Sequence, residues 1–431
     1  MRAAPPDPTP PHLLWVLSKW PLPATDGARV ANINLLRGLA SLGVSIDVVA
    51  IAEKPVDFDP EELKKICGVS SARIVARKPN GRGFRLLGIL AALKSFCHRP
   101  WLPVTFAPFA AGNVRAEMAD ILSQGTRGSK PWTAIVYDGL HQAAHSSNFS
   151  GFEEPLPGLP VFYRAHNVEA EIWRRKALTT RFPPLRLFSL FQASLMRRFE
   201  SSLIRKSSAV LSVSEKDFAH FRSAVPGIRG GVVPIGYDFG ESSAPAAPSP
   251  GRESRLLFLG KLDWPPNRDG LIWFLDRVWN EAKRLRPDLE LWIAGSGDSE
   301  WLKSRTDSPG IRFLGRVESV DELYRDCALS IVPIFYGSGT RVKAIESSRY
   351  SRPCLSTEIG VEGLGLTAGA TYLRAETAEE WISALVHLDP MRARSVGAAA
   401  HDFLRKSLHL PFAARKFLDG IAVRPDARPL P

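Results

Sequence analysis

Short apolar runs that lead into glycine-containing loops are the feature that most constrains how this chain of 431 residues can fold. Residues 13–17 form such a run, residues 29–41 have apolar side chains at helical spacing, and residues 45–52 form a second run. A strand, a helix and another strand in this order are typical of a parallel sheet covered by helices. Further strands are expected at residues 133–137, 161–164, 209–213, 255–259, 289–294, 311–314 and 329–332. The chain is therefore predicted to have an α/β fold.

A segment rich in Pro, Ala and Ser at residues 242–254 divides the chain, because the strand–helix pattern restarts after it. The length of the chain also suits two domains better than one. We expect an N-terminal domain over residues 1–241, a linker over 242–254, a second domain over 255–408, and a C-terminal segment over 409–431. Residues 410–421 of that last segment are expected to form a helix.

The composition restricts the partners and the compartment. A formal net charge of +12 implies attraction to nucleic acid, an acidic membrane surface or phosphorylated substrates. Four widely spaced cysteines with no CxxC pair suggest neither a zinc site nor a disulfide framework, which fits a reducing cytoplasm. No apolar stretch approaches the ~20 residues of a membrane-spanning helix. The expected location is cytoplasmic, with peripheral attachment to the inner face of the membrane as an alternative.

Ligands of open α/β sheets bind beyond the carboxyl ends of the strands, so the loops after the apolar runs are the places to search. In the second half these loops each carry a glycine near the strand end. Four basic side chains in them are placed to share a pyrophosphate if the loops converge, although a lone loop cation is usually only solvated. The candidates in three of these loops are Lys261, Arg268, Gly295 and Val317.

The loop after residues 329–334 is the most informative of these. It reads Gly337, Ser338, Gly339, Thr340 and then Arg341, with Lys343 and Glu346 following in a predicted helix. Glycine lets backbone N–H groups approach an anion, and a helix N-terminus adds positive partial charge. A carboxylate about two turns along can accept hydrogen bonds from sugar hydroxyls. The pattern predicts a site for a phosphorylated, hydroxyl-rich ligand; the alternative is a helix entry with a solvated basic face.

Three places in the first half carry weaker signals. His166 ends a strand in a polar cluster, where it can meet a sugar hydroxyl, act as a base, or simply cap the next helix. The loop with Asp26, Gly27 and Arg29 suits an acceptor or a phosphate, or is a helix N-cap. Asp138 is interpreted as the end of a strand rather than a catalytic group.

With these residues in view, the chain resembles the retaining glycosyl transferases group 1 family, which has the two-domain B-type glycosyltransferase fold, with two Rossmann-like domains facing across a cleft. The similarity covers most of the chain and is strongest in the second half. The residues that carry it are Phe258–Asn267, Ala294–Gly297, Phe313–Val317, Gly337–Glu346 and Pro353–Leu364, with Asp26–Arg29, His166–Glu169, Val213–Glu215 and Val233–Asp238 in the first half. The Asn167–Glu169 segment resembles the polysaccharide and exopolysaccharide branch.

The resemblance implies roles for the candidates. Glu346 would bind the nucleotide ribose and backbone near Val317 the base, while Lys261 and the amides of residues 337–340 would hold the diphosphate. His166 would touch the donor sugar, so His166, Lys261 and Glu346 are the candidate catalytic residues. The loop of residues 26–29 would line the cleft near the acceptor. Two positions depart from the family pattern: Ser338 stands where a Glu is frequent, and Lys261 where an Arg is common.

By this resemblance the chain moves a sugar from a nucleoside diphosphate donor to a glycan or lipid-linked acceptor with retention, and no metal or other cofactor is expected. One alternative is another sugar-nucleotide enzyme on the same fold, such as an epimerase. The other is a non-catalytic or nucleic-acid-binding protein, which the absence of a recognisable nucleic-acid module disfavours. Nucleic acid is therefore not an expected partner.

Two basic stretches suggest contact with an anionic membrane. Residues 73–99 hold seven Lys or Arg and no acid, and residues 173–206 hold nine with one Glu. Basic residues beside Leu, Phe and Trp suit an anionic lipid surface. The alternative is a set of ordinary amphipathic helices packed on the sheet, with solvated basic edges.

Overall fold

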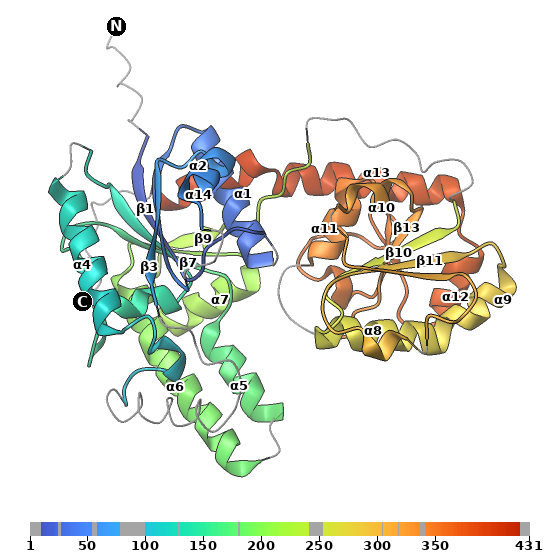
Figure 1. Cartoon of the computed structure of the whole chain (residues 1–431), viewed down its shortest axis with the longest axis horizontal. Helices are drawn as coiled ribbons and strands as arrows, with labels where there is room; N and C mark the ends of the chain where they lie inside the picture. The colour runs from blue at the N-terminus through green and yellow to red at the C-terminus, as the bar shows by residue number, and fades with distance from the viewer. Residues whose placement is uncertain are drawn as a thin grey trace, which may run out of the picture. The chain divides into compact units, whose positions relative to one another are not determined.

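The computed structural model describes residues 10–24, 27–53, 58–77, 100–127, 130–179, 182–240, 253–303, 305–317, 319–336 and 341–422. The chain forms two compact units (Figure 1). The first consists of the chain up to Gly236 together with the segment from Leu410 onward, and the second is Tyr237–His409.

The first unit is built on a seven-stranded sheet in the order β3-β2-β1-β4-β7-β8-β9, with every pair parallel. Its strands are β1 (His12–Leu17), β2 (Ser45–Ala52), β3 (Ser71–Ala76), β4 (Ala134–Asp138), β7 (Val161–Ala165), β8 (Ala209–Ser212) and β9 (Gly230–Val232). Its helices are α1 (Gly27–Ser41), α2 (Pro60–Cys67), α4 (Gly112–Arg127), α5 (Glu169–Thr179), α6 (Pro183–Lys206), α7 (Glu215–Ala224) and α14 (Leu410–Ile421). The short strands β5 (Ser147–Asn148) and β6 (Gly151–Phe152) form an antiparallel pair.

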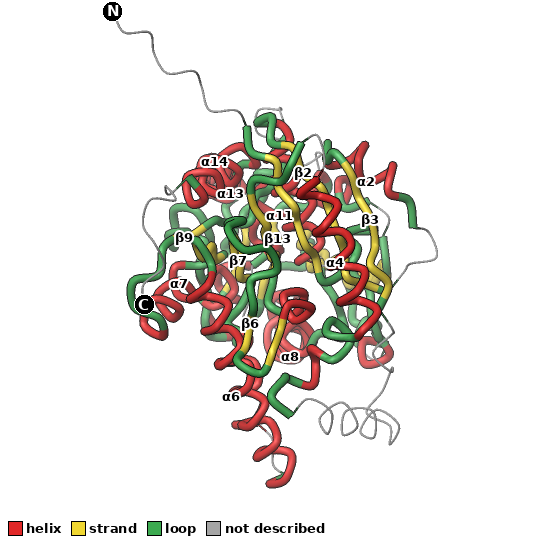
Figure 2. Tube along the Cα trace, turned by 90° about the vertical axis from the view of Figure 1, so that its left-hand side faces the viewer, coloured by secondary structure: helices red, strands yellow, loops and turns green. Residues whose placement is uncertain are grey.

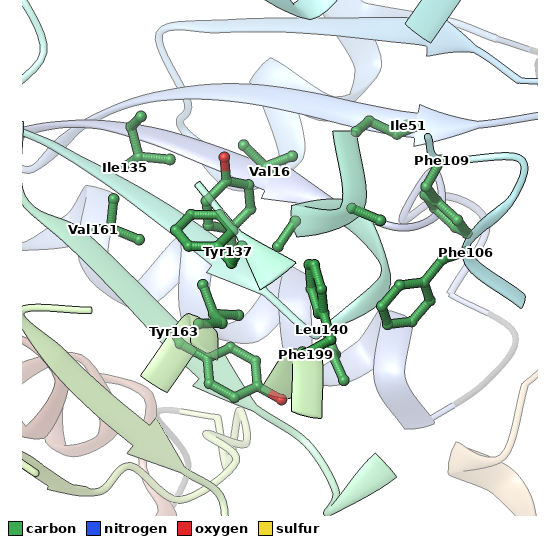
Figure 3. Packing of buried hydrophobic residues seen from close by; sticks show 14 of the residues in the cluster. Val16, Ile51, Phe106, Phe109, Ile135, Tyr137, Leu140, Val161, Tyr163 and Phe199 are labelled. Atoms are coloured by element: carbon green, nitrogen blue, oxygen red, sulfur yellow. The ribbon is translucent and has the colours of Figure 1, made fainter. Parts of the chain in front are cut away.

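Alternation along the strands gives this sheet two apolar faces, because successive side chains of a strand point to opposite sides. Val16 belongs to a core cluster that α4 and α6 complete, part of which is shown in Figure 3. Trp15 belongs to the cluster on the other face, which α1, α2 and α14 cover. The ring of Phe417 in α14 lies 5.1 Å from that of Trp15, so the last described helix is part of the core of the first unit.

The second unit is built on a six-stranded parallel sheet in the order β12-β11-β10-β13-β14-β15. Its strands are β10 (Arg255–Leu259), β11 (Glu290–Ala294), β12 (Ile311–Gly315), β13 (Leu329–Val332), β14 (Cys354–Ser356) and β15 (Leu373–Arg374). Its helices are α8 (Pro265–Phe274), α9 (Asn280–Leu285), α10 (Asp321–Arg325), α11 (Val342–Arg349), α12 (Ala378–Val386) and α13 (Pro390–Leu408).

The predicted α/β fold of two Rossmann-like units is confirmed, and the apolar runs are strands as expected. The sequence also predicts one helix over residues 269–283, which the structure shows with other bounds. It begins at Pro265, because two prolines in the first turn suit positions whose N–H groups need no helical partner. A π-helical turn at Leu275–Trp279 then separates α8 from α9.

In each sheet the chain first adds strands on one side of its first strand and then adds the later strands on the other side. We call the place between these two sets of strands the reversal point. In the first sheet β1 leads outward to β2 and β3, while β4, β7, β8 and β9 extend the other way. In the second sheet β10 leads to β11 and β12, while β13, β14 and β15 extend the other way. The carboxyl ends of β1 and β4, and of β10 and β13, therefore flank the crevices where open α/β sheets bind ligands.

Candidate functional site

A buried carboxylate marks the reversal point of the first sheet. Asp138 is the last residue of β4 and its side chain is fully buried. Trp15 in the neighbouring β1 donates its indole N–H to Asp138 Oδ2 at 2.9 Å. Arg164 in β7, the partner of Asp138 in the strand register, donates from one terminal nitrogen to both carboxylate oxygens at 2.8 and 3.0 Å. Three adjacent strands thus converge on one side chain.

His166 comes directly after β7 and is fixed by the same carboxylate. Its Nε2 atom makes a short hydrogen bond to Asp138 Oδ1. Burial alone raises the pKa of Asp138, but Arg164 and His166 outweigh it and hold the pKa at about 2. The carboxylate is therefore ionised at neutral pH and accepts the Nε2 proton of His166. In the neutral ring this leaves Nδ1 as an acceptor suited to a hydroxyl.

Helix α1 lies against this group. Asn32 in α1 accepts a hydrogen bond from Arg164 at 3.2 Å, and Arg29, one turn earlier, donates from Nε to the carbonyl of Trp20 at 3.0 Å. Gly27 is the first residue of α1. Asp26 lies outside the described residues. Asn32 thus ties α1 to the Asp138 group.

A second polar group lies at the reversal point of the other sheet. Lys343, in the first turn of α11 after β13, places its Nζ atom 2.5 Å from Asn267 Oδ1 in α8 after β10. Asn267 is buried, and its Nδ2 atom donates to the Lys261 carbonyl at 2.7 Å. Asn267 therefore joins the two loops on either side of the reversal point.

Close backbone approach keeps this edge of the sheet compact. A Cβ on Gly260 would lie 2.6 Å from the Cε and Nζ atoms of Lys343, so glycine gives the lysine its room. A Cβ on Gly295 would lie 1.8 Å from the Gly260 carbonyl oxygen. The amide of Gly260 donates to Ala294, and that of Gly295 donates to Gly315. The carboxyl ends of β10, β11 and β12 are thus held side by side.

Helix α11 brings two cations and a carboxylate to this edge. Arg341 is its buried N-cap residue and lies 3.1 Å from Glu362. Burial lowers the pKa of Lys343 to about 8, with Glu346 opposing this effect and Arg341 adding to it. Burial raises the pKa of Glu346, while Lys343 and Arg349 lower it. The helix N-terminus and the two cations favour an anion beside a carboxylate that can accept hydrogen bonds.

The remaining candidates are less closely gathered. The side chain of Lys261 is 65% exposed and lies 3.5 Å from Asp263, so only its carbonyl takes part in the Asn267 contact. Arg268 pairs with its neighbour Asp269 at 3.4 Å. Val317 packs against the cluster around Tyr324. Residues Gly337, Ser338, Gly339 and Thr340 lie outside the described residues.

Arg164 and Asn267 are site residues that sequence reasoning missed, and Asp138 was interpreted only as the end of a strand. Arg164 is a fully buried cation in an apolar strand, and Asp138 ends another apolar strand. Opposite charges at the same end of two buried strands were the signal that could have found the pair. For Asn267 the motif gave its position but not its partner.

Among the described residues, no group of three or more His, Cys, Asp or Glu side chains is arranged to hold a metal ion. The described helices include none that combines the length and the apolar character needed to cross a bilayer.

Comparisons with known proteins agree with this architecture. Residues 253–388 match the family model described as glycosyl transferases group 1. A Klebsiella pneumoniae protein, described as an uncharacterized 44.6 kDa protein in cps region, is 34% identical over 122 residues, or 26% of this chain and 31% of that protein. The chain thus matches about a third of the length of this relative.

Two solved structures resemble the whole chain. The crystal structure of Anabaena HepE in complex with UDP and glucose has a TM-score of 0.60 at 12% identity, covering 96% of this chain and 100% of that one. The crystal structure of TarM has a TM-score of 0.64 at 10% identity, covering 95% and 98%. At these identities the likeness shows the fold, which is the two-domain B-type glycosyltransferase fold. The match to the glycosyl transferases group 1 model thus lies within the second unit, and the whole chain shares the two-domain fold of these structures.

Proposed function

We propose that this chain transfers a sugar from a nucleoside diphosphate sugar to a hydroxyl of a glycan or lipid-linked acceptor. The Lys343–Asn267 bridge at the reversal point of the second sheet carries the proposal. It fixes a cation beside the N-terminus of α11, with Glu346 on the same helix. A diphosphate would meet Lys343 and Arg341, and ribose hydroxyls would meet Glu346. UDP and glucose in the HepE complex fit a ligand of this class.

We further propose that the anomeric configuration is retained by attack on the face that the leaving group occupies. The bond from the anomeric carbon to the phosphate oxygen breaks, and a bond from that carbon to the acceptor oxygen forms. The acceptor proton passes to the leaving diphosphate, so no protein nucleophile is needed. Arg341, Lys343 and the dipole of α11 would stabilise the departing charge without a metal. His166 Nδ1 would accept a hydrogen bond from a hydroxyl of the donor sugar.

A role in polysaccharide assembly is the finer part of the proposal. The resemblance of Asn167–Glu169 to the polysaccharide branch motivates it. The cps region named for the Klebsiella relative supports it.

A thermal-shift screen against UDP-, GDP-, ADP- and dTDP-sugars tests the donor site. One nucleotide class should stabilise the protein, and Glu346→Gln should abolish that stabilisation while Glu322→Gln, an exposed acid in α10, leaves it intact. A folded protein that no sugar nucleotide stabilises would contradict the donor site.

Product analysis tests the reaction. Anomer-resolved NMR should find the donor configuration in the product, and turnover should persist in EDTA. An inverted product would refute retention, and a donor isomerised without an acceptor would indicate an epimerase instead.

A further inference from the structure

The helix pair α5–α6 carries large apolar side chains on its solvent side. Among them are Phe182 at 64% exposure, Leu187 at 70%, and Leu190 and Phe191 at 42% each. Leu187, Leu190 and Phe191 follow the i, i+3, i+4 spacing and therefore share one face of α6. Exposed apolar side chains scattered singly need no explanation, but a contiguous group of this kind marks an interaction surface.

The two halves of α6 differ in what they contact. Toward its C-terminal end, Met196, Phe199 and Leu203 are buried in the core of the first unit. Its N-terminal half extends past the rest of that unit in both views (Figures 1 and 2). The described residues from Pro183 to Phe188 are all exposed or half-buried. The apolar face therefore lies on the projecting half of the helix.

The projecting half is an ordered part of the unit. The ring of Trp173 in α5 lies 6.3 Å from that of Phe188 in α6, and Lys176 Nζ lies 4.7 Å from the Trp173 ring. At the start of the buried half, the amide of Val104 donates to Gln192 at 2.9 Å. These contacts hold the two helices together and fix α6 to the unit, so the exposed side chains are displayed on a supported surface.

The positive charge of the α5–α6 helix pair indicates an anionic partner. Its described residues include eight basic side chains: Arg174, Arg175, Lys176, Arg186, Arg197, Arg198, Arg205 and Lys206. Glu171 pairs with Arg174 and Arg175 at 2.6 and 3.3 Å. Burial raises the pKa of Glu200 to about 8, so this acid offsets little of the positive charge at pH 7. Two copies of such a surface would repel each other, whereas an anionic surface is complementary.

We propose that α5–α6 docks the protein on an anionic lipid bilayer, with Phe182, Leu187, Leu190 and Phe191 entering the boundary between headgroups and acyl chains. Arg186 and the neighbouring cations then lie at the level of the headgroups, with their aliphatic stems along the apolar surface. The surface differs from the donor site, which lies in the other unit. The other basic stretch noted in the sequence, residues 73–99, lies largely outside the described residues and is not part of this surface.

Vesicle sedimentation with the full-length chain, without donor or acceptor, tests the proposal. The protein should sediment with vesicles of phosphatidylcholine mixed with phosphatidylglycerol, and much less with phosphatidylcholine alone. Leu187→Ser/Phe191→Ser should weaken binding roughly tenfold or more. The matched control Leu285→Ser/Met391→Ser removes two exposed apolar side chains from the second unit and should bind like the wild type. The melting temperatures of both double variants should stay near the wild-type value.

Several results would overturn the proposal. One is wild-type protein that stays in the supernatant with anionic vesicles at low salt, and another is a Leu187→Ser/Phe191→Ser variant that binds as well as the control. A concentration-dependent dimer that this variant abolishes, without vesicle binding, would assign the surface to a second copy. A DNA complex without vesicle binding would assign it to nucleic acid. Because no sugar nucleotide is present, failure here is distinguishable from failure of the proposed transferase activity.

Discussion

Asp138 is an acid whose ionised form is kept in the interior by its neighbours. Trp15 donates to one of its oxygens, His166 to the other and Arg164 to both. A buried pair of this kind adds little net stability over a well-packed apolar pair, but it is costly to break, because the remaining charge is left unpaired. The group therefore fixes the orientation of His166 more than it strengthens the fold.

Replacing Asp138 with Asn should lower the free energy of unfolding by about 3–5 kcal/mol, since Arg164 would remain buried without a counterion. Chemical denaturation measures this loss, with Asp120→Asn, a change at an exposed acid of α4, as the control. In protein that still folds, His166 loses its carboxylate partner, so turnover should fall more than donor affinity. Unchanged stability would show that the buried pair does not act as described.

In the proposed donor site, Lys343 should make donor binding depend on pH, because burial lowers its pKa to about 8. The lysine is charged below that pH and neutral above it, so affinity for a nucleoside diphosphate should fall as the pH rises from 7 to 9. Lys343→Arg keeps its charge throughout this range and should flatten the dependence. Isothermal titration calorimetry of both proteins measures the two slopes. Equal slopes would mean that another group is responsible.

Among the helices and strands, α6 and β7 share a buried acid. Tyr163 donates its hydroxyl to Glu200 Oε1 at 2.9 Å. Burial raises the pKa of Glu200 to about 8; the Tyr163 hydrogen bond opposes this effect and the charge of Glu169 adds to it. The folded protein thus holds a proton that the unfolded chain releases near its ordinary pKa of 4.5. Stability from this group is present below pH 4.5 and is lost as the pH rises toward 8.

Glu200→Gln should remove the loss of stability that accompanies a rise in pH from 4.5 toward 8. The amide keeps an acceptor for the Tyr163 hydroxyl and carries no charge. The variant should match the wild type near pH 5 and exceed it at pH 8 by on the order of 3 kcal/mol. Denaturant midpoints measured across this range give the difference. A constant difference between the two proteins would show that Glu200 does not titrate in this interval.

The sequence allowed the elements to be predicted better than the site. Residues 45–52 and 410–421 have the predicted bounds, because an apolar strand and an amphipathic helix are local patterns. The fold class followed from the order of such patterns. The pairing of Asp138 with Arg164, and of Lys343 with Asn267, depends on strand register and on which strands are neighbours. That information is tertiary, so the sequence suggested Lys343 as a ligand-binding residue without identifying Asn267 as the residue that positions it.

At the scale of the whole molecule, the first unit is discontinuous in sequence. Helix α14 covers the face of the first sheet that holds Trp15, although the second unit precedes it in the chain. Phe417 is fully buried there, and a methyl group on Gly38 of α1 would lie 2.8 Å from the Leu410 carbonyl. α14 therefore packs closely on α1.

Phe417→Ala should destabilise the first unit by about 3–5 kcal/mol through the cavity it leaves. Hydrogen exchange should quicken in α1 and β1 and remain unchanged in β10 and β11, because the two units have separate cores. Phe412→Ala, on the same helix but 37% exposed, is the control and should change little. Equal acceleration in both units would show that they unfold as one.

The place of α14 in the chain also sets the order of events during synthesis. A ribosome completes β1, α1 and β4 early, yet the helix that covers their apolar face emerges only after Tyr237–His409 has been made. At roughly 5–20 residues per second this interval is on the order of ten to thirty seconds. During that time the apolar face that holds Trp15 lacks the helix that covers it. The unit that begins first in the chain is therefore completed last.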